Sequence, residues 1–259
     1  MVELAARNLV IDIPGRPPGT PLDLEIAAGQ VWGVLGPNGV GKTTLLHTLA
    51  GLKAPRAGEV LLNGTPLPRL RRRTVARQLA VVFQERQDGF PATVLETAMI
   101  GRHPYLSPWD VETAEDVGLA RQALQRMELE GLDDRQVGTL SGGERQRLAV
   151  ATALTQTPRV WLADEPTNHL DLHHQVAVMR LLAEQAAAGA TVFMCLHDVN
   201  LAARWCDRLL LLYPDGRACW GAAVDMLAVG ALARLYGQPL TSVVVQGVPV
   251  FVPTESRSS

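Results

Sequence analysis

The chain has little cysteine, and its cysteines form no pattern. Only Cys195, Cys206 and Cys219 occur among the 259 residues. Their odd number and scattered positions exclude a disulfide framework and favour reduced thiols in a cytosolic protein. The sequence also shows no Cys/His spacing of the kind that binds a structural metal ion. We therefore assign no role to five of the six histidines, namely His47, His103, His169, His173 and His174.

Long apolar runs and an excess of one charge are also missing. No stretch of about 18 or more uninterrupted apolar residues occurs, so we predict no membrane-spanning helix. Residues 1–4 do not begin a signal-peptide pattern. If the protein serves transport, we expect another polypeptide to supply the channel. The net charge of −2 gives no reason to expect a nucleic-acid partner. The apolar content of 47% supports a proper core in one large domain, or in one domain with a lobe.

One local excess of positive charge stands out against this neutral background. The run consists of Arg69, Arg71, Arg72, Arg73 and Arg77. We predict that it is the solvated face of a helix. A contact with membrane headgroups or with a partner subunit is the alternative interpretation.

The most informative segment is 36–43, which lies between the apolar run 31–35 and the helix-like stretch 44–50. It matches the phosphate-loop pattern, in which glycines bring backbone N–H groups against phosphate oxygens at a helix N-terminus. Lys42 supplies a charge for the β- and γ-phosphates, and the Thr43 hydroxyl can ligate Mg²⁺. The segment predicts a nucleoside triphosphate site. The residues expected to contact the nucleotide are Gly36, Pro37, Asn38, Gly39, Gly41, Lys42, Thr43 and Thr44.

A pair of carboxylates fits the same site. The predicted buried strand that starts at Val160 ends in Asp164, which is followed by Glu165 and Pro166. Asp164 at such a strand end can hold Mg²⁺, directly or through water. Glu165 can polarise an attacking water as a general base. Pro166 has no N–H to continue the strand ladder.

A second segment, 140–144, begins another helix. Ser141 is a good N-cap, and Glu144 three residues later completes the pattern of a capping box. Gly142 and Gly143 are costly in a first helical turn, which suggests that a ligand approaches the backbone closely there. A helix N-terminus with free N–H groups is a second anion site. The residues expected to face this second phosphate are Ser141, Gly142 and Gly143.

With this second segment the chain resembles an ATP-binding cassette subunit, the nucleotide-hydrolysing part of an ABC transporter. Its motifs occur in the order of the family. By resemblance, Gln84 is the Q-loop glutamine, residues 140–144 are the signature and residues 168–171 are the D-loop. Asp164 and Glu165 match the Walker B aspartate and the catalytic glutamate. His197 matches the switch histidine that senses the γ-phosphate.

The resemblance implies a fold, cofactors and partners. It implies an α/β fold, with a P-loop NTPase core and an inserted α-helical signature subdomain. The core would combine a mostly parallel sheet and its flanking helices with an N-terminal antiparallel β subdomain. Residues 1–259 would form a single domain, with 1–86 and 156–259 as the core and 87–155 as the helical subdomain. The cofactors would be ATP and Mg²⁺, with Thr43, Gln84 and Asp164 as the metal ligands.

The family also implies an assembly. Two copies form a homodimer in which the phosphate loop of one faces the signature of the other across ATP. Integral membrane permease subunits supply the channel, and a periplasmic or surface substrate-binding protein takes part indirectly. The subunit would then lie at the cytoplasmic face of the inner membrane as a peripheral protein. In the family, the neighbourhood of Tyr105 and Trp109 receives a coupling helix of the permease. We expect these two aromatic side chains to be exposed, and packing inside the helical subdomain is the alternative.

Patterns along the chain predict the individual elements. Strands are predicted at 3–11, 22–27, 31–35, 58–62, 79–83 and 209–213, with further strands starting at Val160 and Thr191 and two short ones within 240–253. Helices are predicted at 94–100, 111–127, 145–154, 171–187 and 199–206. The alternation after residue 160 favours βα units around a mostly parallel sheet.

The sequence leaves the base and the substrate open. Family members stack adenine on an aromatic residue after the first strand, but residues 11–19 contain none, and Arg16 is the alternative. Segments 90–105 and 235–253 resemble the bacterial importers of iron-siderophores, haem and vitamin B12. Segment 19–24 leans toward the B12 ATPases. The main alternative to an importer is a soluble ABC-class ATPase that is not coupled to transport.

Overall fold

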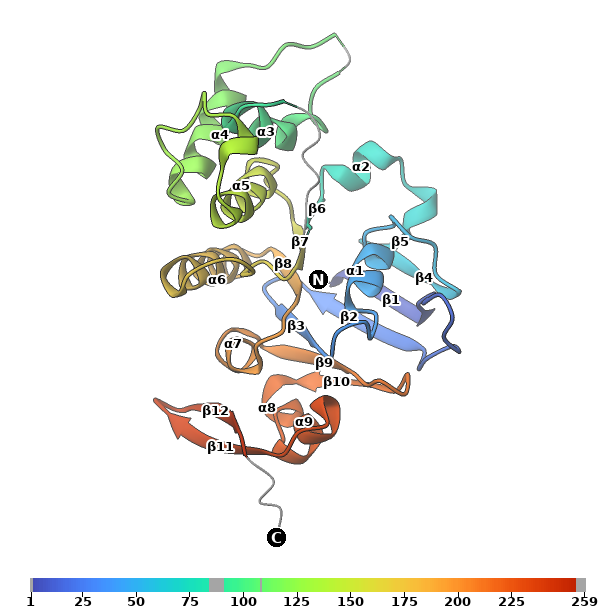
Figure 1. The fold of residues 1–259 in the computed structure, drawn as a ribbon. Coiled ribbons are helices and arrows are strands. Elements are labelled where there is room, and N and C mark those ends of the chain that lie inside the picture. The colour runs from blue at the N-terminus through green and yellow to red at the C-terminus, as the bar shows by residue number, and fades with distance from the viewer. Residues whose placement is uncertain (1, 84–90, 108, 255–259) are drawn as a thin grey trace.

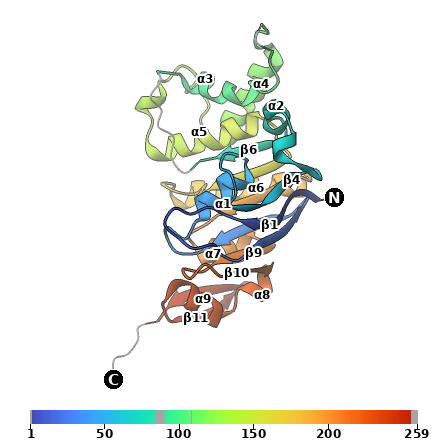
Figure 2. The same ribbon diagram turned by 90° about the vertical axis from the view of Figure 1, so that its right-hand side faces the viewer.

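The computed structural model describes residues 2–83, 91–107 and 109–254. The molecule is an α/β protein with a central six-stranded sheet, a four-stranded antiparallel sheet beside it, and helices on its faces (Figure 1). The helical part made of α3, α4 and α5 lies at one end, and the hairpin β11–β12 lies at the other (Figure 2). This arrangement confirms the predicted fold class.

The six-stranded sheet has the order β10-β9-β3-β8-β7-β6. Its strands run parallel to one another, except that β10 pairs antiparallel with β9 at the edge. Every residue of β3, β7 and β8 is buried, because helices and the second sheet cover both faces. The strands are β3 (Val31–Leu35), β6 (Leu79–Val82), β7 (Val160–Asp164), β8 (Thr191–Cys195), β9 (Arg208–Leu212) and β10 (Ala218–Ala222).

The four-stranded sheet has the order β2-β1-β4-β5 and is antiparallel throughout. In β2, buried and exposed residues alternate, as expected for a strand with one face on the core. The strands are β1 (Val2–Val10), β2 (Leu22–Ala27), β4 (Ala57–Leu62) and β5 (Thr65–Pro66). The predicted strands at 3–11, 22–27 and 58–62 are confirmed to within one residue at each end.

Two apolar clusters lie on opposite faces of the central sheet. Along β7, Val160 and Leu162 belong to the cluster shared with α1, whereas Trp161 and Ala163 belong to the cluster shared with α5 and α6. Successive side chains of a strand point to opposite faces of the sheet, so β7 contributes to the apolar cluster on each face. The remaining elements of this part are α1 (Lys42–Leu49), α6 (Leu172–Ala187), α7 (Val199–Trp205), α8 (Ala223–Met226), α9 (Val229–Tyr236), β11 (Leu240–Val245) and β12 (Val248–Pro253).

The helices α3, α4 and α5 pack on one another and share the cluster that also covers one face of the sheet. Their bounds are α3 (Val94–Met99), α4 (Ala114–Arg126) and α5 (Gly142–Thr155), with 3-10 turns at Leu67–Arg69, Ile100–Arg102 and Val137–Thr139. Among the helices of the described residues, none combines the length and the apolar character that crossing a membrane requires.

The predicted helix at 111–127 starts too early. Helix α4 begins at Ala114 because Thr113 is its N-cap. The Thr113 hydroxyl accepts a hydrogen bond from the Asp116 N–H at 3.2 Å, and the Asp116 carboxylate accepts one from the Thr113 N–H at 3.0 Å. These hydrogen bonds, with one from Arg102, lower the pKa of Asp116 to about 2. Elements α8, α9 and β10 were not predicted.

The basic run is exposed, as predicted, and it contains the short helix α2 (Arg72–Ala76). Some of its guanidinium groups also donate to backbone carbonyls. Arg73 and Arg77 each donate to the Pro104 carbonyl at 2.8 Å. The Tyr105 ring lies under Arg102 at 4.0 Å, and its hydroxyl donates to the Gln156 carbonyl at 3.0 Å. Tyr105 is therefore half-buried, which corrects the expectation that it is exposed and favours the alternative of packing, whereas Trp109 is exposed as expected.

Candidate nucleotide-binding and hydrolysis site

The sheet order brings the distant sequence motifs together. Strand β8 lies between β3 and β7, so the carboxyl ends of these three parallel strands form one edge. The phosphate loop follows β3, Asp164 ends β7 opposite Cys195, and His197 follows β8. In open α/β sheets this edge is where ligands bind.

The phosphate loop makes the tight strand-to-helix turn that the pattern predicts. Helix α1 begins at Lys42, and its N-cap Gly41 has a φ of 112°, which side chains rarely tolerate. A Cβ at Gly41 would lie 2.5 Å from Ile13 Cδ1, and one at Gly36 would lie 2.6 Å from the Leu212 carbonyl oxygen. Only glycine fits at these two positions, and the first N–H groups of α1 are left facing a potential anion.

Lys42 lies inside this turn. Its Nζ donates to the Gly36 carbonyl at 2.7 Å and to the Pro37 carbonyl at 3.4 Å, and the residue is 5% exposed. Burial lowers the pKa of Lys42, while the neighbouring Glu165 and Asp164 act in the opposite direction. The ammonium is thus held at the phosphate loop and close to both carboxylates.

Asp164 is the most deeply buried carboxylate of this edge. It is 1% exposed, and neither of its oxygens has a hydrogen-bond partner within the described part of the chain. A buried carboxylate without donors is costly unless a cation compensates it. Burial and the nearby Asp164 raise the pKa of the Cys195 thiol, which therefore stays neutral. The oxygens of Asp164, with the Thr43 hydroxyl, fit a hard divalent cation such as Mg²⁺.

Glu165 is held by contacts on several sides. Its backbone has a φ of 51°, a strained value for a residue of this type, and its N–H donates to the Cys195 carbonyl at 3.1 Å. The Asn168 side-chain amide donates to its carboxylate, and His197 Nε2 contacts the other carboxylate oxygen. Strain of this kind is often found at functional sites, where the surrounding structure maintains it.

These groups line one cleft with a volume of about 350 Å³. It joins the phosphate loop to Glu165 and to His197, whose side chain is 42% exposed. Gly36, Pro37 and Asp164 do not line the cleft, but the carbonyls of Gly36 and Pro37 accept the hydrogen bonds of Lys42. The lining residues are Ile13, Asn38, Gly39, Gly41, Lys42, Thr43, Thr44, Glu165 and His197. Gln84 lies outside the described residues.

The signature residues do not line this cleft. Ser141 caps α5, and the capping box is confirmed: the Ser141 hydroxyl accepts from the Glu144 N–H at 3.2 Å, and Glu144 accepts from the Ser141 N–H at 2.7 Å. A Cβ at Gly143 would lie 3.1 Å from the His169 carbonyl oxygen, so packing within the chain favours glycine there. A Cβ at Gly142 would make ordinary contacts. Ser141 and Gly142 are exposed.

Comparison with known proteins agrees with this geometry. The profile of the ABC transporter family matches residues 20–168. This chain belongs to the ABC transporter family. The haemin import ATP-binding protein HmuV of Streptomyces coelicolor is 39% identical to it over 91% of this chain and 84% of that protein. HmuV of Myxococcus xanthus is 41% identical over 88% of each.

Solved ABC transporter structures share the fold along most of the chain. One belongs to a transporter assigned to the metal-chelate type and solved in an inward-facing conformation; the identity is 27%, the TM-score 0.86, and 99% of each chain is covered. Another is a dimeric bacterial ABC transporter cassette with 28% identity and a TM-score of 0.72, covering 85% of this chain and 98% of that one. The fold and the family are therefore those of an ABC transporter ATPase.

Two residues of this ABC transporter cassette were missed as site residues. Ile13 lines the cleft and contacts the position of Gly41, although it was noted only as part of a segment without aromatics. Asn168 binds the Glu165 carboxylate, although it was noted only as part of the D-loop. The signal for Asn168 was its place three residues after Glu165, where the chain turns back.

Proposed function

We propose that this chain binds Mg·ATP in the cleft and hydrolyses it to power the import of a haem-type metal chelate through a separate membrane permease. The observation that supports the chemistry best is the meeting of Lys42, Glu165 and His197 in one cleft. The observation that supports the substrate is that the curated relatives described above are haemin import proteins. Cobalamin and iron-siderophores are also metal chelates, and they are the alternative substrates.

Each residue has a role in this proposal. The Lys42 ammonium and the N–H groups of the loop neutralise the phosphates. Thr43, Asp164 and Gln84 hold Mg²⁺, which when bound neutralises charge that develops on the phosphate oxygens. Glu165 accepts a proton from the attacking water, and Asn168 keeps its carboxylate oriented. His197, on the exposed side of Glu165, contacts the γ-phosphate.

The adenine base would lie against Ile13. A second cavity of about 310 Å³ adjoins the nucleotide cleft and shares Ile13 with it. Ile11 and Arg16 line this cavity as well. An aliphatic side chain and a guanidinium plane would then take the place of the aromatic ring that family members use.

The working unit would be a homodimer. Ser141 and Gly142 are exposed at the start of α5 and separate from the cleft of their own chain, so a partner copy can present them to ATP. The dimeric cassette structure is consistent with such an assembly.

We further propose that residues 1–259 form one ATPase domain. In it, 87–155 would move as a helical subdomain against the core of 1–86 and 156–259, with Gln84 at the hinge.

A bulky substitution in the signature tests whether this segment lies at the dimer interface. In ATP and Mg²⁺, Ser141→Arg should weaken dimerisation by more than about tenfold, because the side chain would occupy the place of the partner's γ-phosphate. Analytical ultracentrifugation in a hydrolysis-deficient background measures this. Ser141→Ala loses the helix cap but adds no bulk, so it should still dimerise. A normal ATP-driven dimer of Ser141→Arg would contradict the proposed interface.

Transport requires a membrane partner. Trp109 is 94% exposed and Val111 is 79% exposed, in the region where the family receives the coupling helix of the permease. Two large apolar side chains in solvent favour a protein contact at this place. The subunit would therefore sit as a peripheral protein on the cytoplasmic face of the inner membrane. A periplasmic or surface binding protein would deliver the substrate to the permease.

Isolation of the complex tests the import proposal. We expect the affinity-tagged chain, purified from native membranes in mild detergent, to bring a stoichiometric polytopic membrane protein with it. In proteoliposomes, haemin-loaded binding protein should then stimulate ATP hydrolysis more than cobalamin-loaded or siderophore-loaded protein. Purification without any membrane protein would instead favour a soluble ABC-class ATPase.

A further inference from the structure

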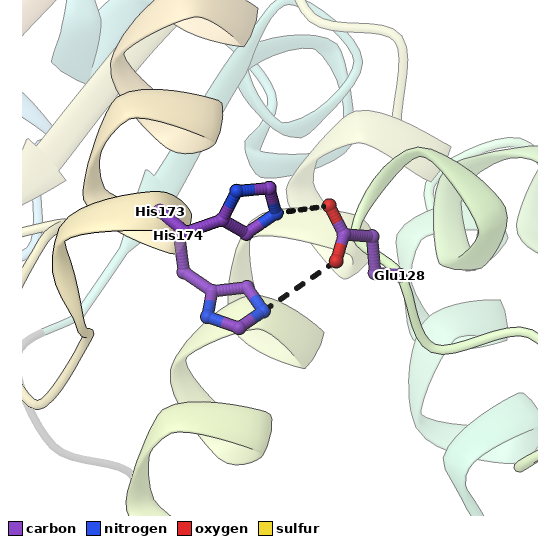
Figure 3. A group of neighbouring side chains, drawn as sticks. All are labelled: Glu128, His173 and His174. Carbon is purple, nitrogen blue, oxygen red and sulfur yellow. Dashed lines mark hydrogen bonds and ion pairs between the residues drawn. The ribbon is translucent and has the colours of Figure 1, made fainter.

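A group of side chains outside the nucleotide cleft joins two parts of the molecule. Glu128 lies just after α4, and His173 and His174 lie in the first turn of α6 (Figure 3). Both imidazole rings point toward the Glu128 carboxylate (Figure 3). One donor atom from each residue lies within 4.8 Å of the other two. No local sequence pattern indicates a role for these histidines, because Glu128 is 45 positions away from His173 along the chain.

The distances are close to those of a metal site. His173 Nε2 lies 2.8 Å from one Glu128 oxygen, and His174 Nε2 lies 3.6 Å from the other. In tetrahedral zinc coordination, bonds of about 2.0–2.2 Å separate neighbouring ligand atoms by roughly 3.3–3.6 Å. Small side-chain rotations would therefore bring all three donors to one ion.

The orientation of His174 favours a cation at this point. Its Nδ1 lies 2.8 Å from Asp171 Oδ1, so a proton on Nδ1 is donated to that carboxylate. In the neutral ring, Nε2 is then a lone pair that faces the Glu128 carboxylate, which is also an acceptor. A carboxylate behind the second ring nitrogen is the usual support of a metal-binding histidine.

The chain holds Glu128 in place from a third element. Arg147 of α5 donates to the Met127 carbonyl at 2.6 Å and to the Glu128 carbonyl at 2.7 Å. The cluster therefore connects the α4–α5 part with the start of α6, whose N-cap Asp171 ends the D-loop segment.

We propose that Glu128, His173 and His174 bind a divalent transition-metal ion, with Zn²⁺ as the best fit, and that Asp171 positions His174 for it. Two imidazoles and one carboxylate, with a fourth position open to water, are a ligand set that zinc accepts. The bound ion would fix the turn after α4 to the N-terminus of α6. The site does not depend on the nucleotide cleft or on the proposed substrate.

Metal titration of the intact, nucleotide-free chain tests this. We expect one Zn²⁺ per chain in competition with a chromophoric chelator, and visible absorption of tetrahedral Co²⁺ at the same stoichiometry. Glu128→Gln and the double variant His173→Gln/His174→Gln should each weaken zinc binding by more than about tenfold. Asp171→Asn can still cap α6, and it should weaken binding by about tenfold through His174 alone.

The exposed histidine His103, outside the cluster, gives a matched control. His103→Gln should bind zinc as the original chain does. The replaced side chains are at least partly exposed, so the metal-free variants should unfold at the same temperature as the original chain. Zinc binding that survives the double variant, or that is unchanged in Glu128→Gln, would overturn the proposal. In the second case the ion would not join α4 to α6.

Discussion

Replacing Glu165 by glutamine should lower ATP hydrolysis by about 10²–10⁴ while ATP binding is retained. Glutamine keeps the size and the Asn168 contact of the side chain, but it cannot accept a proton from water. Because Glu165 is 5% exposed and packed between Asn168 and His197, a shape-conserving change leaves the cleft intact. Unhydrolysed ATP should then trap the dimer.

Steady-state phosphate release and equilibrium ATP binding measure the two halves of this prediction. Glu184→Gln is the matched control, since Glu184 is an exposed glutamate that pairs with Arg126 outside the cleft. It should hydrolyse ATP as the original chain does. A Glu165→Gln chain that turns over normally would remove Glu165 from the catalytic role.

Replacing Lys42 by alanine should weaken ATP binding by about 10–100-fold. A hydrogen bond to a charged group contributes about 1.5–3 kcal/mol, and each 1.4 kcal/mol is a factor of ten in affinity. The loss should be in the phosphate interaction, so ADP and ATP should be affected more than adenosine. The variant also leaves the carbonyls of Gly36 and Pro37 without their donor.

The control for this variant is the other lysine near the site. Lys53 donates to the Asp12 carbonyl at 2.6 Å and does not line the cleft. Lys53→Ala should keep nucleotide affinity within about threefold, as expected for a residue without a phosphate contact. Isothermal titration with ADP and ATP separates the two variants. Undiminished nucleotide affinity of Lys42→Ala would exclude Lys42 from the site.

Local sequence patterns predicted the elements that local physics controls. Buried and exposed residues alternate along the strand 22–27 because only one of its faces packs on the core. All residues of the strand 31–35 are buried because both of its faces are covered. The start of α1 at Lys42 and the cap of α5 at Ser141 follow from glycine conformations and side-chain hydrogen bonds within a few residues. The helix predicted from 111 was wrong at its start, since apolar periodicity does not locate the N-cap, which is Thr113.

Other features depended on contacts that no local pattern contains. The half-buried position of Tyr105 depends on distant segments, because its ring lies beside the Arg77 guanidinium and its hydroxyl donates to the Gln156 carbonyl. The preference for glycine at position 143 arises from the His169 carbonyl, whereas the sequence suggested a ligand. Helix α9 and strand β10 are short, and their packing against β11 and β9 decides their structure more than intrinsic propensity does.

By itself, the sequence determined the phosphate loop, the signature cap and the family, because these depend on residue types at short, fixed spacings. The tertiary structure alone decided which of these groups meet. Parallel pairing of β3, β8 and β7 places Lys42, Asp164, Glu165 and His197 at one edge, although Lys42 lies more than a hundred residues before the other three. Packing of the turn after α4 against the start of α6 brings Glu128 to two histidines to which the sequence analysis assigned no role. Such contacts follow from strand order and helix packing, which are set by burial over the whole chain rather than by neighbouring residues.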